Sequence, residues 1–187
     1  MKMKQFLLIT LCCLFAITTQ AQTMHLKFMD IPLDGTIDQF QAKLLKKGVK
    51  LDVEKNKLAK KEPCRYFKGY FAGKSSTIKI KYHHKTKKVW GAMVAIEYPS
   101  KKQADSQLDY YKRLLLKKYP LSSGENVVRQ GIPEYMLSVY DDKDFYGFVY
   151  LYIFQDLNYK DKSVLLVLNY KDYKNTEAGE KDDIEDL

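Results

Sequence analysis

The chain has 187 residues, of which 45% are hydrophobic, and its formal net charge is +9 at pH 7. This length and composition suffice for one domain with a real hydrophobic core. Only one of the three cysteines, Cys64, lies beyond the first two dozen residues, which excludes a mature fold held together by internal disulfide bonds.

Residues 1–21 have the pattern of a secretory signal peptide. Two lysines precede an apolar run from Phe6 to Ile17, and Thr19-Gln20-Ala21 ends the run with small residues at alternate positions. We expect cleavage after Ala21 and an exported protein, either periplasmic or fully secreted.

A retained membrane anchor and a lipoprotein are the alternatives for this segment. The apolar run is about a dozen residues, whereas a bilayer-spanning helix needs roughly 20. Cys12 and Cys13 lie within the run and follow Leu11, whereas a lipid-modified cysteine follows a small residue at the end of such a run. No later segment is apolar enough to cross a membrane, so we expect no transmembrane segment in the mature chain.

Charge is distributed unevenly along the mature chain. Residues 24–171 carry 28 basic and 16 acidic residues, a net charge of +12, whereas residues 172–187 carry two basic and seven acidic residues. A basic body favours anionic partners such as cell-surface phosphates, acidic glycans or an acidic protein. Export argues against nucleic acid as the partner, and solubility alone is the alternative explanation of the charge.

The first half of the mature chain, about residues 30–99, opens with a predicted helix. Thr36 and Gln39 have the spacing of a capping box, and Gly48 suits the left-handed end of a helix. Apolar residues then recur on one helical face, at Ile37, Phe40 and Leu44.

Three main strands are predicted to follow this helix. The expected segments are a short strand at 49–53, an exposed loop at 54–62, and strands at 66–72, 77–82 and 89–98. The strand at 77–82 alternates apolar and polar residues, as a half-buried strand does. The strand at 89–98 is largely apolar on both faces, so we expect it to be central.

The second half, about residues 100–173, repeats this plan. Ser100 is a predicted N-cap, and the helix should end at Tyr119 because Pro120 disfavours helix in the residue before it. The remaining predicted segments are a loop at 121–131 and strands at 135–140, 145–155 and 163–169. Residues 174–187 form an acidic tail that we expect to be disordered.

A helix followed by three strands, twice over, predicts an antiparallel α+β fold with both helices on one face of the sheet. We expect a single domain over residues 22–173. The two halves could lie side by side as separate three-stranded units or merge into one curved sheet.

The strand beginning at Phe145 carries a stripe of aromatic residues. Its odd positions are mostly aliphatic, and its even positions are Tyr146, Phe148, Tyr150, Tyr152 and Phe154. The aliphatic side suits packing against the helices, which would leave the aromatic stripe facing solvent, where it could contact a protein or a glycan. Cross-strand stabilisation of the sheet, or burial as a second core, is the alternative.

A lysine-rich hairpin is the second candidate surface. Lys79 and Lys81 lead into it, His83 and His84 lie within it, and it could hold phosphate or sulfate groups. A charged edge that discourages strand-to-strand aggregation is the alternative.

Catalytic and metal-binding motifs are weak. The sequence contains no G-x-S-x-G elbow, no phosphate-binding glycine loop and no H-E-x-x-H helix. The acidic run at 141–144 lacks the spacing of a calcium loop and predicts a tight turn. We therefore expect no cofactor and no metal, although a pair of distant carboxylates, or Cys64 beside His83 or His84, remains an enzymatic alternative.

The segment from Phe28 to Ile37, following a signal that ends in Ala21-Gln22, resembles small exported proteins of Bacteroides-type bacteria. That resemblance implies no particular activity. The repeated helix-and-strands plan is similar in outline to the tandem fold of beta-lactamase inhibitor proteins and to small envelope-assembly lipoproteins, and this similarity implies a binding role.

Together these features predict a non-catalytic binding module of the bacterial envelope. It would use the aromatic stripe, through Tyr146, Tyr150 and Tyr152, against an envelope protein or a glycan. Two alternatives stay open: a hydrolase of envelope polymers, and a binder of anionic lipid headgroups or phosphate on the lysine-rich hairpin.

Overall fold

The computed structural model describes residues 24–142, 144–155 and 164–176. The predicted signal peptide, the turn at 156–162 and the chain beyond residue 176 lie outside these residues. The elements are β1 (Lys27–Phe28), β2 (Ile31–Pro32), α2 (Ile37–Lys46), β3 (Lys50–Leu51), α3 (Val53–Leu58), β4 (Cys64–Phe71), β5 (Lys74–Tyr82), β6 (Val89–Tyr98), α4 (Lys101–Lys118), β7 (Ser123–Arg129), β8 (Ile132–Tyr140), β9 (Phe145–Phe154) and β10 (Val164–Asp172).

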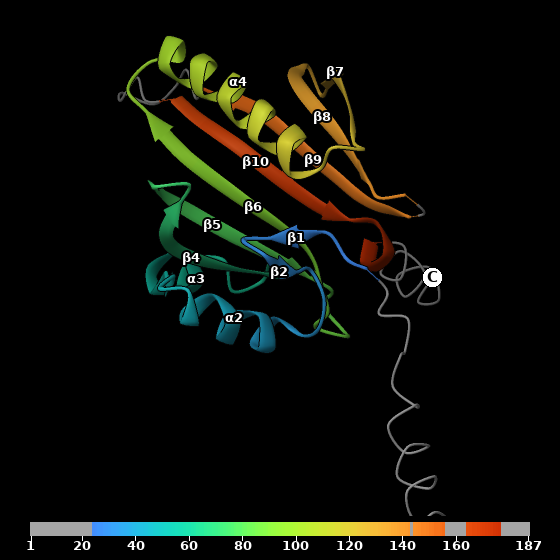
Figure 1. Ribbon diagram of the computed structural model, residues 1–187. Coiled ribbons are helices and arrows are strands. Elements are labelled where there is room, and N and C mark those ends of the chain that lie inside the picture. Colours follow the sequence, from blue (N-terminus) through green and yellow to red (C-terminus); the bar gives the residue numbers. More distant parts are fainter. Residues whose placement is uncertain (1–23, 143, 156–163, 177–187) are drawn as a thin grey trace, which may run out of the picture.

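One antiparallel sheet of eight strands unites the two halves of the chain (Figure 1). Its strand order is β3-β4-β5-β6-β10-β9-β8-β7. The junction is the pairing of β6 with β10, in which Val94 lies opposite Leu168. The α+β fold predicted from the sequence is confirmed, and of the two arrangements left open the structure adopts the single merged sheet.

Both long helices cover the same face of this sheet. The predicted capping box is present, with Thr36 Oγ1 accepting from the Gln39 backbone and the Gln39 side chain accepting from Thr36. Figure 1 shows α4 running along β10 and β9. One continuous core joins Phe40 of α2 and Tyr111 of α4 to the aliphatic side of the sheet.

The β1–β2 hairpin completes this core between the two helices (Figure 1). Leu26, Phe28 and Leu33 are fully buried. The Phe28 ring lies 5.8 Å from that of Phe71 and 5.2 Å from that of Tyr170, so the start of the described chain contacts both halves of the sheet.

Two predicted loops are wrong. Most of the predicted loop at 121–131 is strand β7, an edge strand that pairs only with β8 and is exposed over most of its length, so it lacks apolar alternation. Part of the predicted loop at 54–62 is helix α3, which buries none of its side chains. Its stability comes from polar contacts: Asp52 caps it, and the Asn56 amide donates to the backbone carbonyls of Asp52 and Tyr66.

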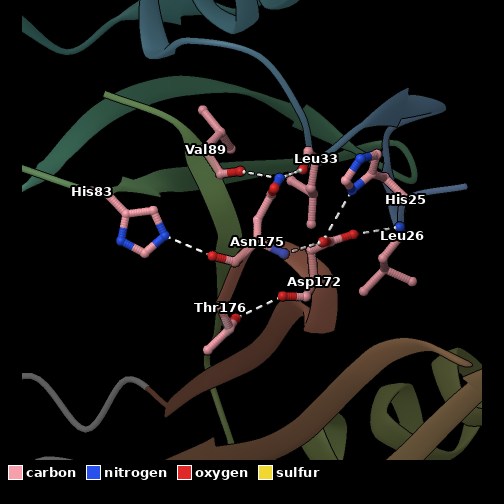
Figure 2. Close-up of polar contacts among 8 residues, drawn as sticks. All are labelled: His25, Leu26, Leu33, His83, Val89, Asp172, Asn175 and Thr176. Atoms are coloured by element: carbon pink, nitrogen blue, oxygen red, sulfur yellow. Dashed lines mark hydrogen bonds and ion pairs between the residues drawn. The ribbon is translucent and has the colours of Figure 1, made fainter. Parts of the chain in front are cut away.

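A buried polar network fastens the start of the described chain to the end of β10 (Figure 2). Asp172 is fully buried, and its carboxylate accepts from the Leu26 and Asn175 backbone N–H groups at 2.8 and 3.0 Å. His25 Nδ1 lies 3.1 Å from the same carboxylate, and this hydrogen bond raises the pKa of His25 above 6.5.

Asn175 extends the network to the β5–β6 hairpin. Its side-chain amide donates to the backbone carbonyls of Leu33 and Val89 at 2.6 and 2.9 Å. The backbone carbonyl oxygen of Asn175 lies 2.7 Å from His83 Nε2 (Figure 2). The described chain therefore remains anchored past residue 174, where the sequence predicted the start of the tail.

Candidate functional site

The strand registers define a face of the sheet that points away from α2 and α4, called here the open face. Residues directly opposite one another in an antiparallel sheet project to the same side. Three rows of side chains cross β5, β6, β10, β9 and β8 on this face. They are Lys81, Gly91, Lys171, Phe148 and Ser138; Lys79, Met93, Asn169, Tyr150 and Met136; and Thr77, Ala95, Val167, Tyr152 and Glu134.

The two surfaces that the sequence suggested separately are therefore one. Four aromatic residues of the predicted stripe lie on the open face: Phe148, Tyr150, Tyr152 and Phe154. Phe148 shares a row with Lys81, and Tyr150 shares a row with Lys79. They are not uniformly exposed, since Tyr150 is 7% exposed and Phe154 is 42% exposed.

Tyr146 departs from the predicted stripe. A register shift between Val139 and Tyr140, with Gly147 at φ +145°, interrupts the alternation of β9. Tyr146 consequently packs in the core and donates a hydrogen bond to Asp141. Phe145 takes the place next to Phe148, with ring centroids 4.9 Å apart.

Basic side chains lie over several of the rings of the open face. Arg129 Cζ is 4.5 Å from the centre of the Tyr150 ring, and Lys171 Nζ is 5.7 Å from it. Lys81 Nζ is 5.2 Å from the centre of the Trp90 ring. Such cation–π contacts keep positive charge close to an aromatic surface, a combination that suits an anionic partner with an apolar side.

Lys81 lies among other basic side chains of this face. It contacts Asn169 Oδ1 at 3.4 Å, and no carboxylate lies within ion-pairing distance of it among the described residues. Burial, followed by the positive charges of Lys171 and Lys79, lowers its pKa to about 8. Gly91 stands between Lys81 and Lys171 in their row, so no side chain separates these two lysines there.

Lys79 is instead held in an ion pair. Its Nζ lies 2.7 Å from Glu62 Oε2, and although burial lowers its pKa, hydrogen bonding to Glu62 leaves that pKa raised overall. The Cys64 thiol points to the same carboxylate at 3.4 Å, and burial raises its pKa above 9.0. A raised thiol pKa disfavours the thiolate that a nucleophilic cysteine requires.

A groove of about 400 Å³ opens on this face where the β7–β8 hairpin meets β9, β10 and β6. The hairpin turns at Gln130 and Gly131, which have φ values of +52° and +78°. One wall carries Arg129, Glu134, Tyr152 and Phe154. The other residues lining the groove are Met93, Ala95, Gln130, Ile132, Leu165, Val167 and Asn169. Its size lies within the range of about 300–1,000 Å³ typical of ligand sites.

Glu134 is the most unusual group in this groove. Its side chain is 10% exposed, and its buried Oε2 atom makes no hydrogen bond. Arg129 Nε lies 3.8 Å away, close enough for electrostatic attraction but too far for a hydrogen bond. Its charge contributes to the raised pKa values of Tyr150 and Tyr152, for which burial is the first cause.

The sequence did not indicate the other members of this site. Arg129 lies in the predicted loop, Glu134 precedes the predicted strand, and Lys171 follows the last one. Period-2 alternation extended through β10 would have placed Asn169 and Lys171 on one face. No sequence signal indicates that the β7–β8 hairpin brings Arg129 to Tyr150.

The His25–Asp172 pair is a different kind of site. A carboxylate that orients an imidazole is a feature of acid–base catalysis, but the Asp172 carboxylate also accepts two backbone N–H groups. Its hydrogen bonds hold chain segments together, which is a structural role. Among the described residues, no group of three or more His, Cys, Asp or Glu side chains could hold a metal ion.

The chain matches no protein-family model, no curated protein and no solved structure. Within the described residues, none of the helices has both the length and the apolar character to cross a bilayer.

Proposed function

We propose that this protein is an exported, non-catalytic binding module of the bacterial envelope whose open face recognises an anionic partner. The observation that carries the proposal is the half-buried cluster of basic side chains over aromatic rings, on the face that α2 and α4 leave uncovered.

Charge supports an anionic partner. Residues 24–171 carry a net charge of +12, and Lys81 lies against other cations with its pKa lowered to about 8. An arriving anion would relieve the repulsion among Lys81, Lys171 and Arg129. Strongly perturbed ionisable groups of this kind gather at functional sites more often than elsewhere.

The same residues favour binding over hydrolysis. Glycoside hydrolysis uses two carboxyl groups across the scissile bond, and Glu134 is the one carboxylate among the described residues that line the groove. The enzymatic alternative in which Cys64 acts beside His83 is disfavoured as well. The Cys64 thiol contacts Glu62, whereas the His83 ring contacts the Asn175 backbone carbonyl, so the two side chains have different polar partners.

A pull-down with the mature chain, residues 22–187, tests this proposal. Tyr152→Ala combined with Phe154→Ala removes two rings of the open face that line the groove. We expect this variant to recover much less of the partner from an envelope extract than the wild type does. Raising the salt concentration should reduce recovery by the wild type, because charge attraction is screened.

The matched control is Tyr110→Ala combined with Leu116→Ala, which removes two exposed side chains of α4, on the other side of the sheet, 43% and 39% exposed. This control should recover the partner as the wild type does, and thermal melts should show that both variants fold. Equal recovery by the groove variant and the wild type would contradict the proposal.

A further inference from the structure

The groove beside the β7–β8 hairpin combines an apolar wall with polar groups that can serve a hydroxyl-rich ligand. Tyr152 and Phe154 supply aromatic surface, while Arg129, Asn169 and Gln130 supply hydrogen-bond donors. A sugar ring presents the matching chemistry, because it has C–H groups on its faces and hydroxyl groups around its edge. Aromatic rings pack against the C–H groups, and polar side chains form hydrogen bonds with the hydroxyl groups.

Glu134 points to the same class of ligand. A carboxylate that is nine-tenths buried with an oxygen making no hydrogen bond is costly, since buried polar groups are normally satisfied. Strand register places it beside Tyr152 on the open face, and Arg129 Nε lies 3.8 Å from its unbonded oxygen. A ligand hydroxyl would satisfy this oxygen by donating to it, whereas a ligand anion would be repelled by it.

The acid group of the ligand should therefore lie elsewhere, and Asn169 shows where. This residue lines the groove and also contacts Lys81 Nζ at 3.4 Å. Lys171 is two residues further along β10, on the same face. Asn169 thus adjoins both the groove and these two lysines, which do not themselves line it.

We propose, resting on the binding function inferred above, that this groove binds a sugar unit of an anionic saccharide, with hydroxyls on Glu134 and Arg129 and the acid group toward Lys81 and Lys171. Carboxylate and sulfate are the two acid groups that share this chemistry. Lys81 keeps most of its charge near neutral pH, since its pKa is about 8.

Titration of the mature chain with four probes tests this. The probes are tetragalacturonate, a heparin-derived sulfated tetrasaccharide, neutral maltotetraose, and the acidic peptide tetraglutamate. We expect at least one acidic oligosaccharide to bind about tenfold or more tighter than both maltotetraose and tetraglutamate. Trp90, the one tryptophan of the chain, lies 5.2 Å from Lys81 Nζ, so its fluorescence should change on binding.

Matched variants locate the site. Glu134→Gln, Phe154→Ala and Lys81→Gln should each lower the affinity for the acidic oligosaccharide by about tenfold. Tyr110→Ala and Lys46→Gln make the same kinds of change at exposed positions of α4 and α2, on the other side of the sheet, and should leave the affinity unchanged. Phe154 is 42% exposed, so its variant keeps the test valid if Glu134→Gln does not fold.

Three results would overturn this inference. The first is that neither acidic oligosaccharide binds, and the second is that tetraglutamate or maltotetraose binds as tightly as the acidic oligosaccharides do. The third is that Phe154→Ala binds an acidic oligosaccharide with the affinity of the wild type. Tight binding of tetraglutamate would leave the proposed anionic binding face standing and remove only its saccharide specificity. The pull-down above uses no sugar probe, so it judges the binding face independently.

Discussion

At the scale of single residues, Lys81 sets the expected pH dependence of binding. Its pKa is lowered to about 8 by burial and by neighbouring positive charge, chiefly Lys171 and Lys79. The ammonium form attracts an anion and the neutral amine does not. Affinity should therefore be highest below pH 8 and should fall as the pH rises through that value.

Affinity for an acidic oligosaccharide, measured from pH 6.5 to 9.5 at constant ionic strength, checks this expectation. The wild type should lose affinity around and above pH 8, and Lys81→Gln should bind weakly with a flatter profile. Cys64 and Tyr150 face the same region, but their pKa values are raised above 9.0 and 10.0, so they stay mostly protonated near pH 8. An identical pH profile in Lys81→Gln would show that another group is responsible.

At the scale of elements, Asp172 holds the β1–β2 hairpin in place. In Asp172→Ala, the Leu26 and Asn175 N–H groups lose their acceptor, and each unsatisfied buried donor costs about 1–3 kcal/mol. We expect the free energy of unfolding to fall by about 3 kcal/mol, measured by urea denaturation. Asp142→Ala, at an exposed position, should change it by less than about 0.5 kcal/mol. Similar losses in both variants would argue against the network.

The sequence predicted the elements that local chemistry specifies and missed those that depend on distant partners. The Thr36–Gln39 capping box is a local device, and it identified α2 correctly. Strand β7 was missed because its stability comes from pairing with β8, which no alternation in its own residues indicates.

The position of Tyr146 was predicted wrongly although the sequence contained a signal for it. A lone glycine inside a strand pattern indicates a bulge, and Gly147 was the available clue. Its φ is +145°, and a Cβ at this position would lie 2.0 Å from the Lys171 carbonyl oxygen. Reading that glycine as a bulge would have moved Tyr146 from the candidate site to the core.

At the scale of the whole molecule, the fold places the apolar core on one face of the sheet and the proposed recognition surface on the other. One face of the sheet, with α2, α4 and the β1–β2 hairpin, contains the apolar core, and Cys64 among the described residues is a free cysteine. The open face carries lysines, Arg129 and aromatic rings that this core does not require. The candidate site could be predicted only in part, because Arg129, Glu134 and Lys81 come to one face through the strand order β5-β6-β10-β9-β8-β7.

The most direct test of the binding face is a lysine-acetylation footprint of the mature chain, read by mass spectrometry with and without envelope extract. We expect Lys81 and Lys171 to become less reactive with the extract, while Lys46 and Lys47, exposed at the end of α2 on the other side of the sheet, react as before. Protection of Lys101 and Lys112 on α4, with Lys81 unchanged, would place the binding surface on the helical side and contradict this account.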